Sequence, residues 1–281
     1  MEPAELAKVL TVVASRTGID FRDYRPETLA RGVAQRLVAS RSKSVDAYVE
    51  RLMGTPGEVA ELTRAFLVPV TEFFRDAPVF QALATIVLPS FLWVRHPRQV
   101  LRVWSIGTAT GEEAWSIAML LEIGRQIYGY SDYEVVATDL DPTSLAIAER
   151  GVYQTSALAN IPEPLRSQFL IKNGDLTQIA PSLRPRVHFV SHDVVGRVLA
   201  PTRAVVASFD IILLRNVLIY FDRRLQEKAL ERVRSVIEDD GALVLGMVET
   251  LPVDLEAHFE VFPDTDAAHR IFRRRREVLK P

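Results

Sequence analysis

The sequence predicts a doubly wound α/β sheet that follows an all-helical N-terminal domain and carries a small antiparallel β insertion. Between residues 101 and 250, short apolar runs that suit buried strands alternate with helical patterns, as in the strand-helix-strand units of a parallel sheet. Residues 1–66 show helical spacing only. The alternation stops between about residues 160 and 186, where Asn173-Gly174 separates two short apolar runs and predicts a hairpin. The expected division is a helical domain (1–66), a linker with a connecting helix (67–93) and an α/β domain (94–281).

The composition excludes several classes of function. The chain has 281 residues, is 48% hydrophobic and has a formal net charge of −2, which argues against a general nucleic-acid binder. It has no cysteine, so disulfides and thiolate zinc sites are excluded. There is no signal-peptide pattern and no uninterrupted apolar run of about 18 residues, so we expect a cytoplasmic protein without membrane insertion.

Four helices are expected in the N-terminal domain, because apolar residues recur within it at helical spacing. The first ends at Gly18, the third closes at the turn 54–57, and the fourth runs from about Glu58 to Phe66. The second begins near Pro26, and its residues expected to face inward are Leu29, Val33, Leu37 and Val38.

The second of these helices also carries a basic cluster, Arg31, Arg36 and Arg41. From Arg16 to Lys43 the chain holds seven basic residues against three acidic ones, a local excess of four positive charges. A solvated helix face accounts for such a run, and a surface for an acidic partner is the alternative.

The segment Leu101–Met119 predicts a ligand site. It begins as a buried strand, turns through Gly107 and Gly111, and continues as a helix, so backbone N–H groups at the helix start lie over the sheet edge. The Gly-x-x-x-Gly spacing differs from that of dinucleotide binders, and Glu112 and Glu113 follow where a pyrophosphate would need to lie. A cationic or zwitterionic ligand suits this turn, and S-adenosylmethionine, with its sulfonium and α-ammonium groups, is the candidate.

A second buried strand, Tyr133–Asp139, ends in a carboxylate. An acidic residue at the end of the second parallel strand can accept hydrogen bonds from both ribose hydroxyls of a nucleoside. Helix capping is the alternative role, but Asp141-Pro142 already supplies an N-cap and a first helical residue. Asp139 is therefore predicted to bind the ribose.

Further apolar runs complete the expected sheet. They are Val187–Val190, Phe209–Leu214 and Ala242–Gly246, followed by a closing antiparallel pair at 258–262 and 270–274. A helix is expected from about 224 to 237 and a turn at Asp239-Asp240-Gly241.

Five segments together resemble one protein family. They are Thr-Glu-Phe-Phe-Arg (71–75), Trp-Ser-x-Gly-x-x-x-Gly-Glu-Glu-x-x-Ser (104–116), Ala-Thr-Asp-Leu-Asp (137–141), Arg-Asn-Val-Leu-Ile-Tyr-Phe-Asp (215–222) and Leu-Gly-x-x-Glu (245–249). In this order they resemble the chemotaxis-receptor glutamate methyltransferases, the CheR family, over nearly the whole chain. The resemblance implies a class I S-adenosylmethionine-dependent methyltransferase fold. It also implies transfer of methyl groups to glutamate side chains, with S-adenosylhomocysteine as the other product and no metal.

The resemblance implies that several segments contact the cofactor. The candidates are Thr71, Arg75, Gly107, Glu112, Glu113, Asp139, His192, Asp193, Arg215 and Asn216. Among them, Glu112 or Glu113 would meet the methionine end of the cofactor and Asp139 its ribose. His192 and Asp193, which stand where the family usually has Asn-Leu, would flank the adenine.

For catalysis, the resemblance implies that Tyr220 lies beside the transferred methyl, with either Arg95 or Arg98 near it. The expected partner is the acidic, cytoplasmic helical domain of a chemotaxis-type receptor, bound by a monomer, and no nucleic acid is expected. The basic helix would face this partner through Arg31, Arg36 and Arg41.

The chemistry of this reaction needs few side chains. A glutamate carboxylate is already anionic at neutral pH, so its attack on a sulfonium methyl needs in-line placement and exclusion of water, and no general base. Two other functions stay open: a class I methyltransferase acting on another protein or a small molecule, and a cofactor-binding scaffold without catalysis. The Asn-Pro-Pro-Tyr motif of adenine-N6 methylation is absent, since the corresponding place reads Arg-Asn-Val-Leu (215–218).

Overall fold

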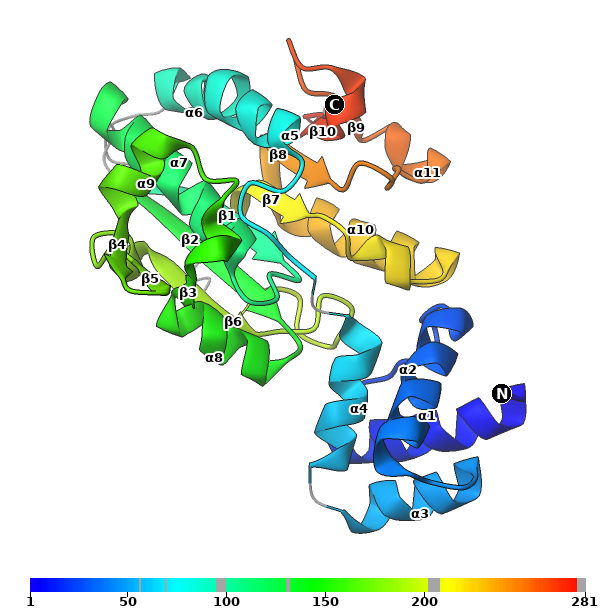
Figure 1. Cartoon of the computed structure of the whole chain (residues 1–281). Helices are drawn as coiled ribbons and strands as arrows, with labels where there is room; N and C mark the ends of the chain where they lie inside the picture. The colour runs from blue at the N-terminus through cyan, green and yellow to red at the C-terminus, as the bar shows by residue number, and fades with distance from the viewer. Residues whose placement is uncertain (56, 69, 95–99, 130–131, 202–207, 277–281) are drawn as a thin grey trace. The chain divides into compact units, whose positions relative to one another are not determined.

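The computed structural model divides into two compact units (Figure 1). It describes residues 1–55, 57–68, 70–94, 100–129, 132–201 and 208–276. The first unit comprises Met1–Pro69 with Leu218–Lys228, and the second comprises Val70–Val217 with Ala229–Pro281. The domain ranges expected from the sequence stay a prediction. They assign residues 218–228 to the α/β domain, whereas the structure groups Leu218–Lys228 with the N-terminal helices. That grouping depends on contacts between segments almost 200 residues apart, as described below.

Four helices make up most of the helical unit. They are α1 (Pro3–Thr17), α2 (Pro26–Ser40), α3 (Val45–Gly54) and α4 (Glu58–Leu67). Gly18, at φ 74°, ends α1 as expected. Leu29 and Val33 are buried, but Val38 is 80% exposed, so the prediction that it faces inward is wrong. Val38 lies nine residues after Leu29, which corresponds to two and a half turns and places the two on opposite faces of α2.

A buried carboxylate links three helices of this unit. The side chain of Glu58 in α4 accepts hydrogen bonds from Arg36 of α2 and from the Tyr48 hydroxyl of α3, each at 2.9 Å. Burial by itself would raise the pKa of Glu58, but the hydrogen bonds from Arg36 and Tyr48 outweigh it and lower the pKa. Arg36 is thus engaged within its own unit, whereas Arg31 and Arg41 are exposed.

We expect Glu58→Gln to lower the free energy of unfolding by about 1–3 kcal/mol at pH 7, because it removes the charged acceptor of this network. The folded-state pKa of Glu58 lies below its usual 4.5, so the carboxylate stabilises the fold above that pH and loses this effect as the pH falls through the folded pKa. Urea unfolding between pH 7 and pH 4 should therefore show a deficit that begins to shrink toward the acidic end. Glu61→Gln, at a half-exposed carboxylate, is the control and should cost less than about 1 kcal/mol. Equal free energies of unfolding for Glu58→Gln and the parent protein at pH 7 would contradict the stabilising role of Glu58.

The second unit is built on a seven-stranded sheet with the order β6-β2-β1-β7-β8-β10-β9. The strands are β1 (Val100–Ile106), β2 (Asp132–Asp139), β6 (Val187–Ser191), β7 (Phe209–Leu214), β8 (Ile237–Leu245), β9 (Phe259–Val261) and β10 (Ile271–Arg274). The first five in this order run parallel, and β10 pairs antiparallel with both β8 and β9. The strand order reverses between β1 and β7, which is where open α/β sheets bind ligands. The predicted doubly wound fold is confirmed.

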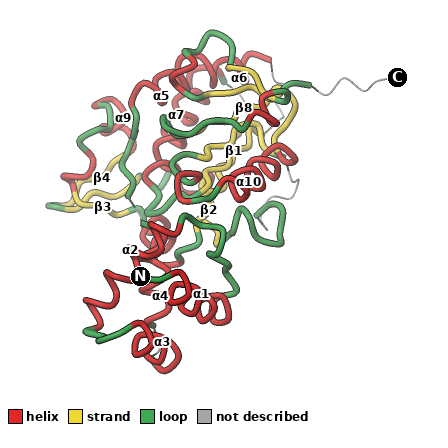
Figure 2. The backbone as a smooth tube through the Cα atoms, turned by 90° about the vertical axis from the view of Figure 1, so that its right-hand side faces the viewer, coloured by secondary structure: helices red, strands yellow, loops and turns green. Residues whose placement is uncertain are grey.

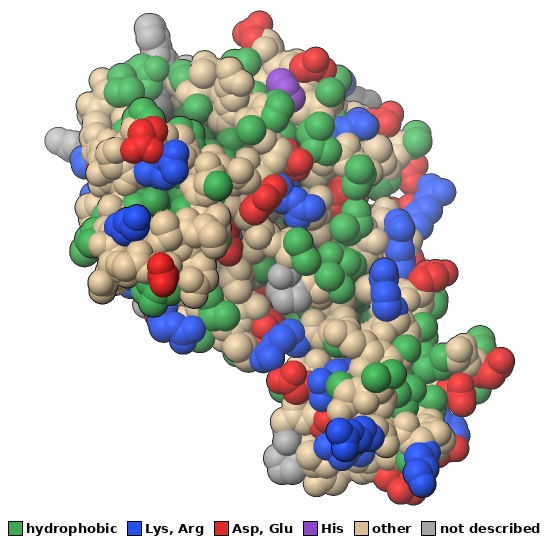
Figure 3. Space-filling view, in the orientation of Figure 1, with side chains coloured by type: hydrophobic (Ala, Val, Ile, Leu, Met, Phe, Trp, Pro, Cys, Tyr) green, Lys and Arg blue, Asp and Glu red, His purple; other side chains and the backbone are tan. Residues whose placement is uncertain are grey.

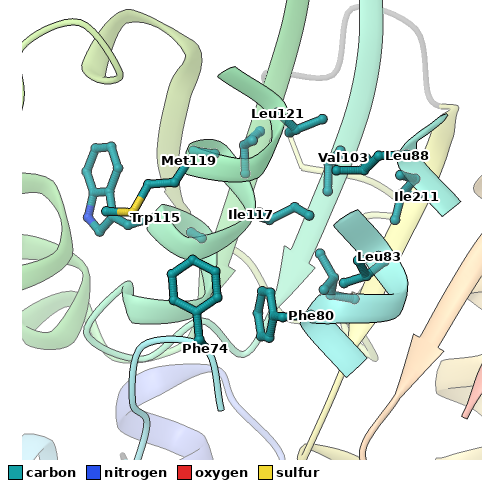
Figure 4. Packing of buried hydrophobic residues seen from close by; sticks show 14 of the residues in the cluster. Phe74, Phe80, Leu83, Leu88, Val103, Trp115, Ile117, Met119, Leu121 and Ile211 are labelled. Atoms are coloured by element: carbon teal, nitrogen blue, oxygen red, sulfur yellow. The ribbon is translucent and has the colours of Figure 1, made fainter. Parts of the chain in front are cut away.

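Helices cover both faces of this sheet. The connections are α7 (Glu112–Tyr128) from β1 to β2, α8 (Pro142–Arg150) after β2, and α10 (Arg223–Val236) from β7 to β8. Because strand-helix-strand crossovers are right-handed, α7 and α10 lie on opposite faces (Figure 2). Figure 4 shows the core on the α7 side, where Ile117 and Leu121 pack toward Val103 of β1 and Leu83.

The connecting helix before β1 is interrupted. It consists of α5 (Ala77–Ala82), a π turn η1 (Leu83–Val87) and α6 (Leu88–Val94). Pro89 has no N–H and its ring clashes with the carbonyl four residues earlier in a regular α-helix. The wider π turn directly before it relieves this conflict.

The predicted hairpin belongs to a three-stranded antiparallel sheet with the order β3-β5-β4. Its strands are β3 (Val152–Gln154), β4 (Leu170–Asn173) and β5 (Leu176–Ile179), with α9 (Glu163–Phe169) before β4 and Gly174 in the turn at φ 62°. The strand β3 lies before residue 160, where the insertion was expected to begin. It was not predicted, because three residues are too few to show an alternating pattern.

The turn expected at residues 239–241 is instead part of β8. Ile237 pairs with Phe209 and Ala242 pairs with Ile211, so the intervening residues form an irregular bulge in which Asp240 has φ 63°. The closing pair, β9 and β10, is antiparallel as expected. The remaining short helices are η2 (Thr155–Leu158), η3 (Arg184–Arg186), η4 (Leu218–Tyr220), α11 (Val253–Glu256) and η5 (Ala267–His269). Within the described ranges, no helix has the length and apolar character that a bilayer span requires.

Candidate cofactor site

The loop between β1 and α7 packs so closely that glycine is required at two positions. A Cβ atom on Gly107, at φ 68°, would lie 2.4 Å from Val217 Cγ2. One on Gly111, at φ 94°, would lie 2.6 Å from the Cβ of Ala148 in α8. The glycines therefore let this loop lie against the loop after β7 and against α8.

Asp139, at the end of β2, is held by this loop. Its Oδ2 accepts a hydrogen bond of 2.8 Å from the Ala109 N–H, and its Oδ1 accepts one of 2.9 Å from the Asp141 N–H. Burial raises the pKa of Asp139. Each carboxylate oxygen has a second lone pair, so Asp139 can still accept hydrogen bonds from a ribose. Asp141 caps α8 as predicted, by accepting from the Thr143 and Ser144 N–H groups.

The two glutamates at the start of α7 differ in their partners. Glu113 accepts hydrogen bonds from the Ser105 hydroxyl at 2.9 Å and from Arg215 at 3.0 Å. Glu112 is buried and accepts from the Thr110 hydroxyl at 2.7 Å, and no cation among the described residues is hydrogen-bonded to it. Burial raises its pKa. Glu112 is therefore the glutamate better suited to a cationic ligand, since the charge of Glu113 is compensated.

Arg215, whose place in the cofactor pocket stays a prediction, is a buried link between three segments. Besides Glu113 of α7, its guanidinium donates to the Asp76 carboxylate at 2.7 Å and to the Arg75 carbonyl at 2.9 Å. Phe74 and Asp76 adopt φ 53° and 59°, a strained conformation for residues other than glycine. Arg215 thus holds the strained segment before α5 against the sheet end.

Asn216, directly after Arg215, is held from a second strand. Glu249, buried in the loop after β8, accepts hydrogen bonds from the Asn216 N–H at 2.9 Å and from the Gly246 N–H at 2.7 Å. A Cβ atom on Gly246 would lie 2.9 Å from the Asn216 nitrogen, so glycine is required there. Asn216 itself has φ 59°. The Leu-Gly-x-x-Glu motif therefore has a structural role at the site that its residues alone did not reveal.

His192 lies near Asp139, because it directly follows β6, the strand that pairs with β2. Its ring is 5.5 Å from the Trp104 ring, and the backbone N–H of His192 donates to the Asp139 carbonyl at 3.2 Å. Burial lowers the pKa of His192, so the ring is neutral at pH 7. In the described part of the chain, neither His192 Nε2 nor the buried Thr108 hydroxyl has a hydrogen-bond partner. Buried polar atoms of this kind are normally satisfied, so both can serve a ligand. Thr108 was not predicted, because only its glycine neighbour stands out in the sequence.

The remaining candidates are spread more widely. Thr71 is half-buried, and Arg75 donates to the Val70 carbonyl at 3.1 Å. Asp193 accepts from the Val195 N–H at 3.0 Å. Tyr220 belongs to the helical unit. Arg95 and Arg98 lie outside the described residues.

These features fit S-adenosylmethionine. The loop between β1 and α7, where close packing requires glycine, lies beside the carboxylates of Glu112 and Asp139. Glu112 suits an ammonium or sulfonium group, and Asp139 suits ribose hydroxyls. Two polar atoms without a described partner lie beside the same loop. Among the residues that the structure describes, no group of three or more histidine or acidic side chains is arranged to hold a metal ion.

Two family models match the chain. The one described as the SAM binding domain of CheR methyltransferase matches residues 69–268, and the one described as its all-alpha domain matches residues 4–67. The chain belongs to the CheR methyltransferase family. The resemblance inferred from the five motifs is confirmed, as is the assignment to S-adenosylmethionine-dependent methyltransferases.

Individual relatives match this chain over different shares of their own length. It is 31% identical over 283 residues to an uncharacterized 104.1 kDa protein of Rhodobacter capsulatus, matching 100% of this chain and 29% of that protein. A chemotaxis protein methyltransferase of Listeria monocytogenes is 30% identical over 240 residues, with 85% and 87% coverage. The probable biofilm formation methyltransferase WspC of Pseudomonas aeruginosa is 33% identical over 243 residues, with 85% and 55% coverage. The chain therefore spans less than a third of the first relative and most of the second.

Proposed function

We propose that this CheR-family chain transfers methyl groups from S-adenosylmethionine to glutamate side chains on the cytoplasmic helical domain of a chemotaxis-type receptor. The supporting observation is the pair of carboxylates, buried Glu112 and half-buried Asp139, beside the glycine loop where the strand order reverses. This site lies in a chain that matches both domains of the family. We propose that the protein acts in the cytoplasm as a monomer.

When bound, S-adenosylmethionine supplies an electrophilic methyl group. The receptor glutamate is ionised at neutral pH, so one of its oxygens forms a bond to the methyl carbon while the carbon–sulfur bond breaks and the sulfur keeps the electron pair. The products are a glutamate methyl ester and S-adenosylhomocysteine, and no proton is transferred. The protein therefore has to orient the two reactants and exclude water.

Different residues of this chain would perform these tasks. Glu112 binds the ammonium group of the cofactor and Asp139 its ribose, which fixes the direction in which the methyl points. Arg215 is a positioning residue, because its guanidinium is used by Asp76, Glu113 and the Arg75 carbonyl. The Tyr220 hydroxyl orients the receptor carboxylate beside the methyl.

Transfer of tritiated methyl groups to receptor-containing membranes tests this proposal. We expect label in the receptor band that is released by mild base, because carboxylate methyl esters hydrolyse there. Base-stable label would indicate a methyltransferase with another kind of acceptor. Cofactor binding without transfer to any acceptor would indicate a scaffold.

Tyr220→Phe should lower kcat about ten-fold or more, since a lost hydrogen bond to a charged carboxylate is worth at least about 1.4 kcal/mol. Cofactor affinity should change less than two-fold, because the hydroxyl acts on the receptor carboxylate. Steady-state kinetics and calorimetry measure the two quantities. Tyr128→Phe, at the exposed end of α7, is the matched control and should leave both unchanged. Equal small effects of Tyr220→Phe on both would mean that this residue only packs.

The double change Arg31→Glu and Arg41→Glu should raise KM for the receptor several-fold at low salt, with little change in kcat. Both residues are exposed on α2 or at its end, and attraction between exposed charges mainly speeds encounter and weakens with ionic strength. On the face of the helical unit seen in Figure 3, basic and acidic side chains are mixed, so a moderate effect is expected.

Lys8→Glu reverses an exposed charge on α1 of the same unit and is the control for this effect. A normal KM for the double variant at low salt would show that the receptor docks elsewhere.

A further inference from the structure

The segment that carries Tyr220 is bonded to a loop of the N-terminal helices. The Arg25 N–H donates to the Tyr220 carbonyl at 2.9 Å, and the Asp222 N–H donates to the Asp23 carbonyl at 2.9 Å. These two bonds flank an antiparallel bridge between Tyr24 and Phe221. The backbone from Tyr220 to Asp222 thus pairs with residues almost 200 positions earlier in the chain.

Side chains reinforce this pairing. The rings of Tyr24 and Phe221 meet edge to face at 4.9 Å, and Tyr24 in turn meets Phe21 at 4.8 Å. Phe21 packs on Phe66 of α4 at 5.3 Å, so the contact continues into the core of the helical unit. The Arg25 Nε–H also donates to the Phe221 carbonyl at 3.2 Å. All four rings are buried.

The segment is also fixed within itself and at its start. The Gln226 amide donates to the Leu218 carbonyl at 2.9 Å and to the Phe221 carbonyl at 3.2 Å, and the Asp222 carboxylate caps α10 by accepting from the Leu225 N–H at 2.8 Å. At the start, Asn216 is held by Glu249, as described above. The carbonyls of Leu218, Tyr220 and Phe221 are therefore all bonded.

We infer that residues 21–25, here called the docking loop, position Tyr220 for methyl transfer, an inference that rests on the proposed function. A group that orients a reacting carboxylate must be held to within a fraction of an ångström, and a short irregular segment does not provide this alone. The docking loop supplies the missing restraint through two backbone hydrogen bonds, one side-chain hydrogen bond and an aromatic contact. Tyr24 and Arg25 are therefore positioning residues.

The double variant Tyr24→Leu and Arg25→Ala tests this inference, because it removes the aromatic contact and the Nε–H donor but keeps the backbone donors. Val13→Ala, in the buried face of α1, is the matched control, because it destabilises the same unit and no described backbone hydrogen bond joins Val13 to residues 218–222. All variants are assayed well below their Tm values. Hydrogen exchange of the Arg25 and Asp222 amides is measured beside kcat, receptor KM and cofactor Kd.

We expect the double variant to lose at least ten-fold in kcat and ten-fold in protection of both amides, with cofactor Kd within two-fold of the parent. The control Val13→Ala should keep kcat within two-fold of the parent. The protection of the two amides, relative to that of the other amides of the same unit, should also stay as in the parent. Retained protection in the double variant, lost protection with unchanged kcat, or an equal kcat loss in the control would each overturn the inference. Absence of receptor methylation by the parent protein would instead overturn the proposed function and with it the catalytic role of the loop. Hydrogen exchange of the two amides would then still show whether the docking loop holds residues 220–222.

Discussion

Arg215→Met is expected to lower the free energy of unfolding by about 3 kcal/mol or more. The Arg215 side chain is 2% exposed and forms ion pairs with Asp76 at 2.7 Å and Glu113 at 3.0 Å. Removing one partner of a buried ion pair typically costs about 3–5 kcal/mol, because the remaining charges stay in a poorly solvated place. We expect the lower end of that range, since Asp76 keeps 29% of its side chain exposed. Urea unfolding of the whole chain measures the change.

The control for this experiment is Arg166→Met on the surface of the same unit. Arg166 pairs with Glu163 at 3.0 Å, but the two side chains are 42% and 72% exposed. A pair of this kind contributes less than about 1 kcal/mol. If both variants had equally small effects, Arg215 would not be the structural link inferred from its contacts.

Asp139→Ala is expected to weaken S-adenosylmethionine binding by about 1–3 kcal/mol, or roughly 5- to 150-fold in Kd, the usual cost of losing hydrogen bonds to a charged group. Isothermal titration calorimetry measures the affinity. Asp139→Ala also leaves the Ala109 and Asp141 N–H groups without their acceptor, so thermal unfolding is followed beside binding.

Asp132→Asn changes a carboxylate at the opposite end of β2 and is the matched control, which should bind the cofactor normally. Unchanged affinity of Asp139→Ala in a folded protein would contradict the ribose assignment. The site would then depend on Glu112 alone for its negative charge.

Local sequence patterns were sufficient for most elements of the fold. Gly18, Asp141 and Asn173-Gly174 mark a helix end, a helix start and a hairpin through conformations that depend on residues within one turn of each other. The alternation of apolar runs and helical patterns is likewise local, and it predicted the main sheet correctly. The position of Asp139 beside the glycine loop followed from the topology of parallel strands, whose carboxyl ends share one edge.

Other features depend on which distant groups meet, and sequence spacing does not contain this information. The spacing placed Arg36 on a basic helix but could not show that it pairs with Glu58, 22 residues away. It marked Arg215 as a pocket residue but could not show that the side chain is also a buried link to Glu113 and Asp76, which are 102 and 139 residues away.

By itself, then, the sequence determined the fold class and the family, because both follow from short motifs and their order. The position of the cofactor site stays a prediction from the same motifs. The tertiary structure decided which of two adjacent glutamates is free for a cation, since Arg215 lies against Glu113 and not against Glu112. It also decided that the Tyr220 segment belongs with the N-terminal helices. Both depend on hydrogen bonds across long stretches of chain, whose partners are selected by the packing of the whole unit and not by any local pattern.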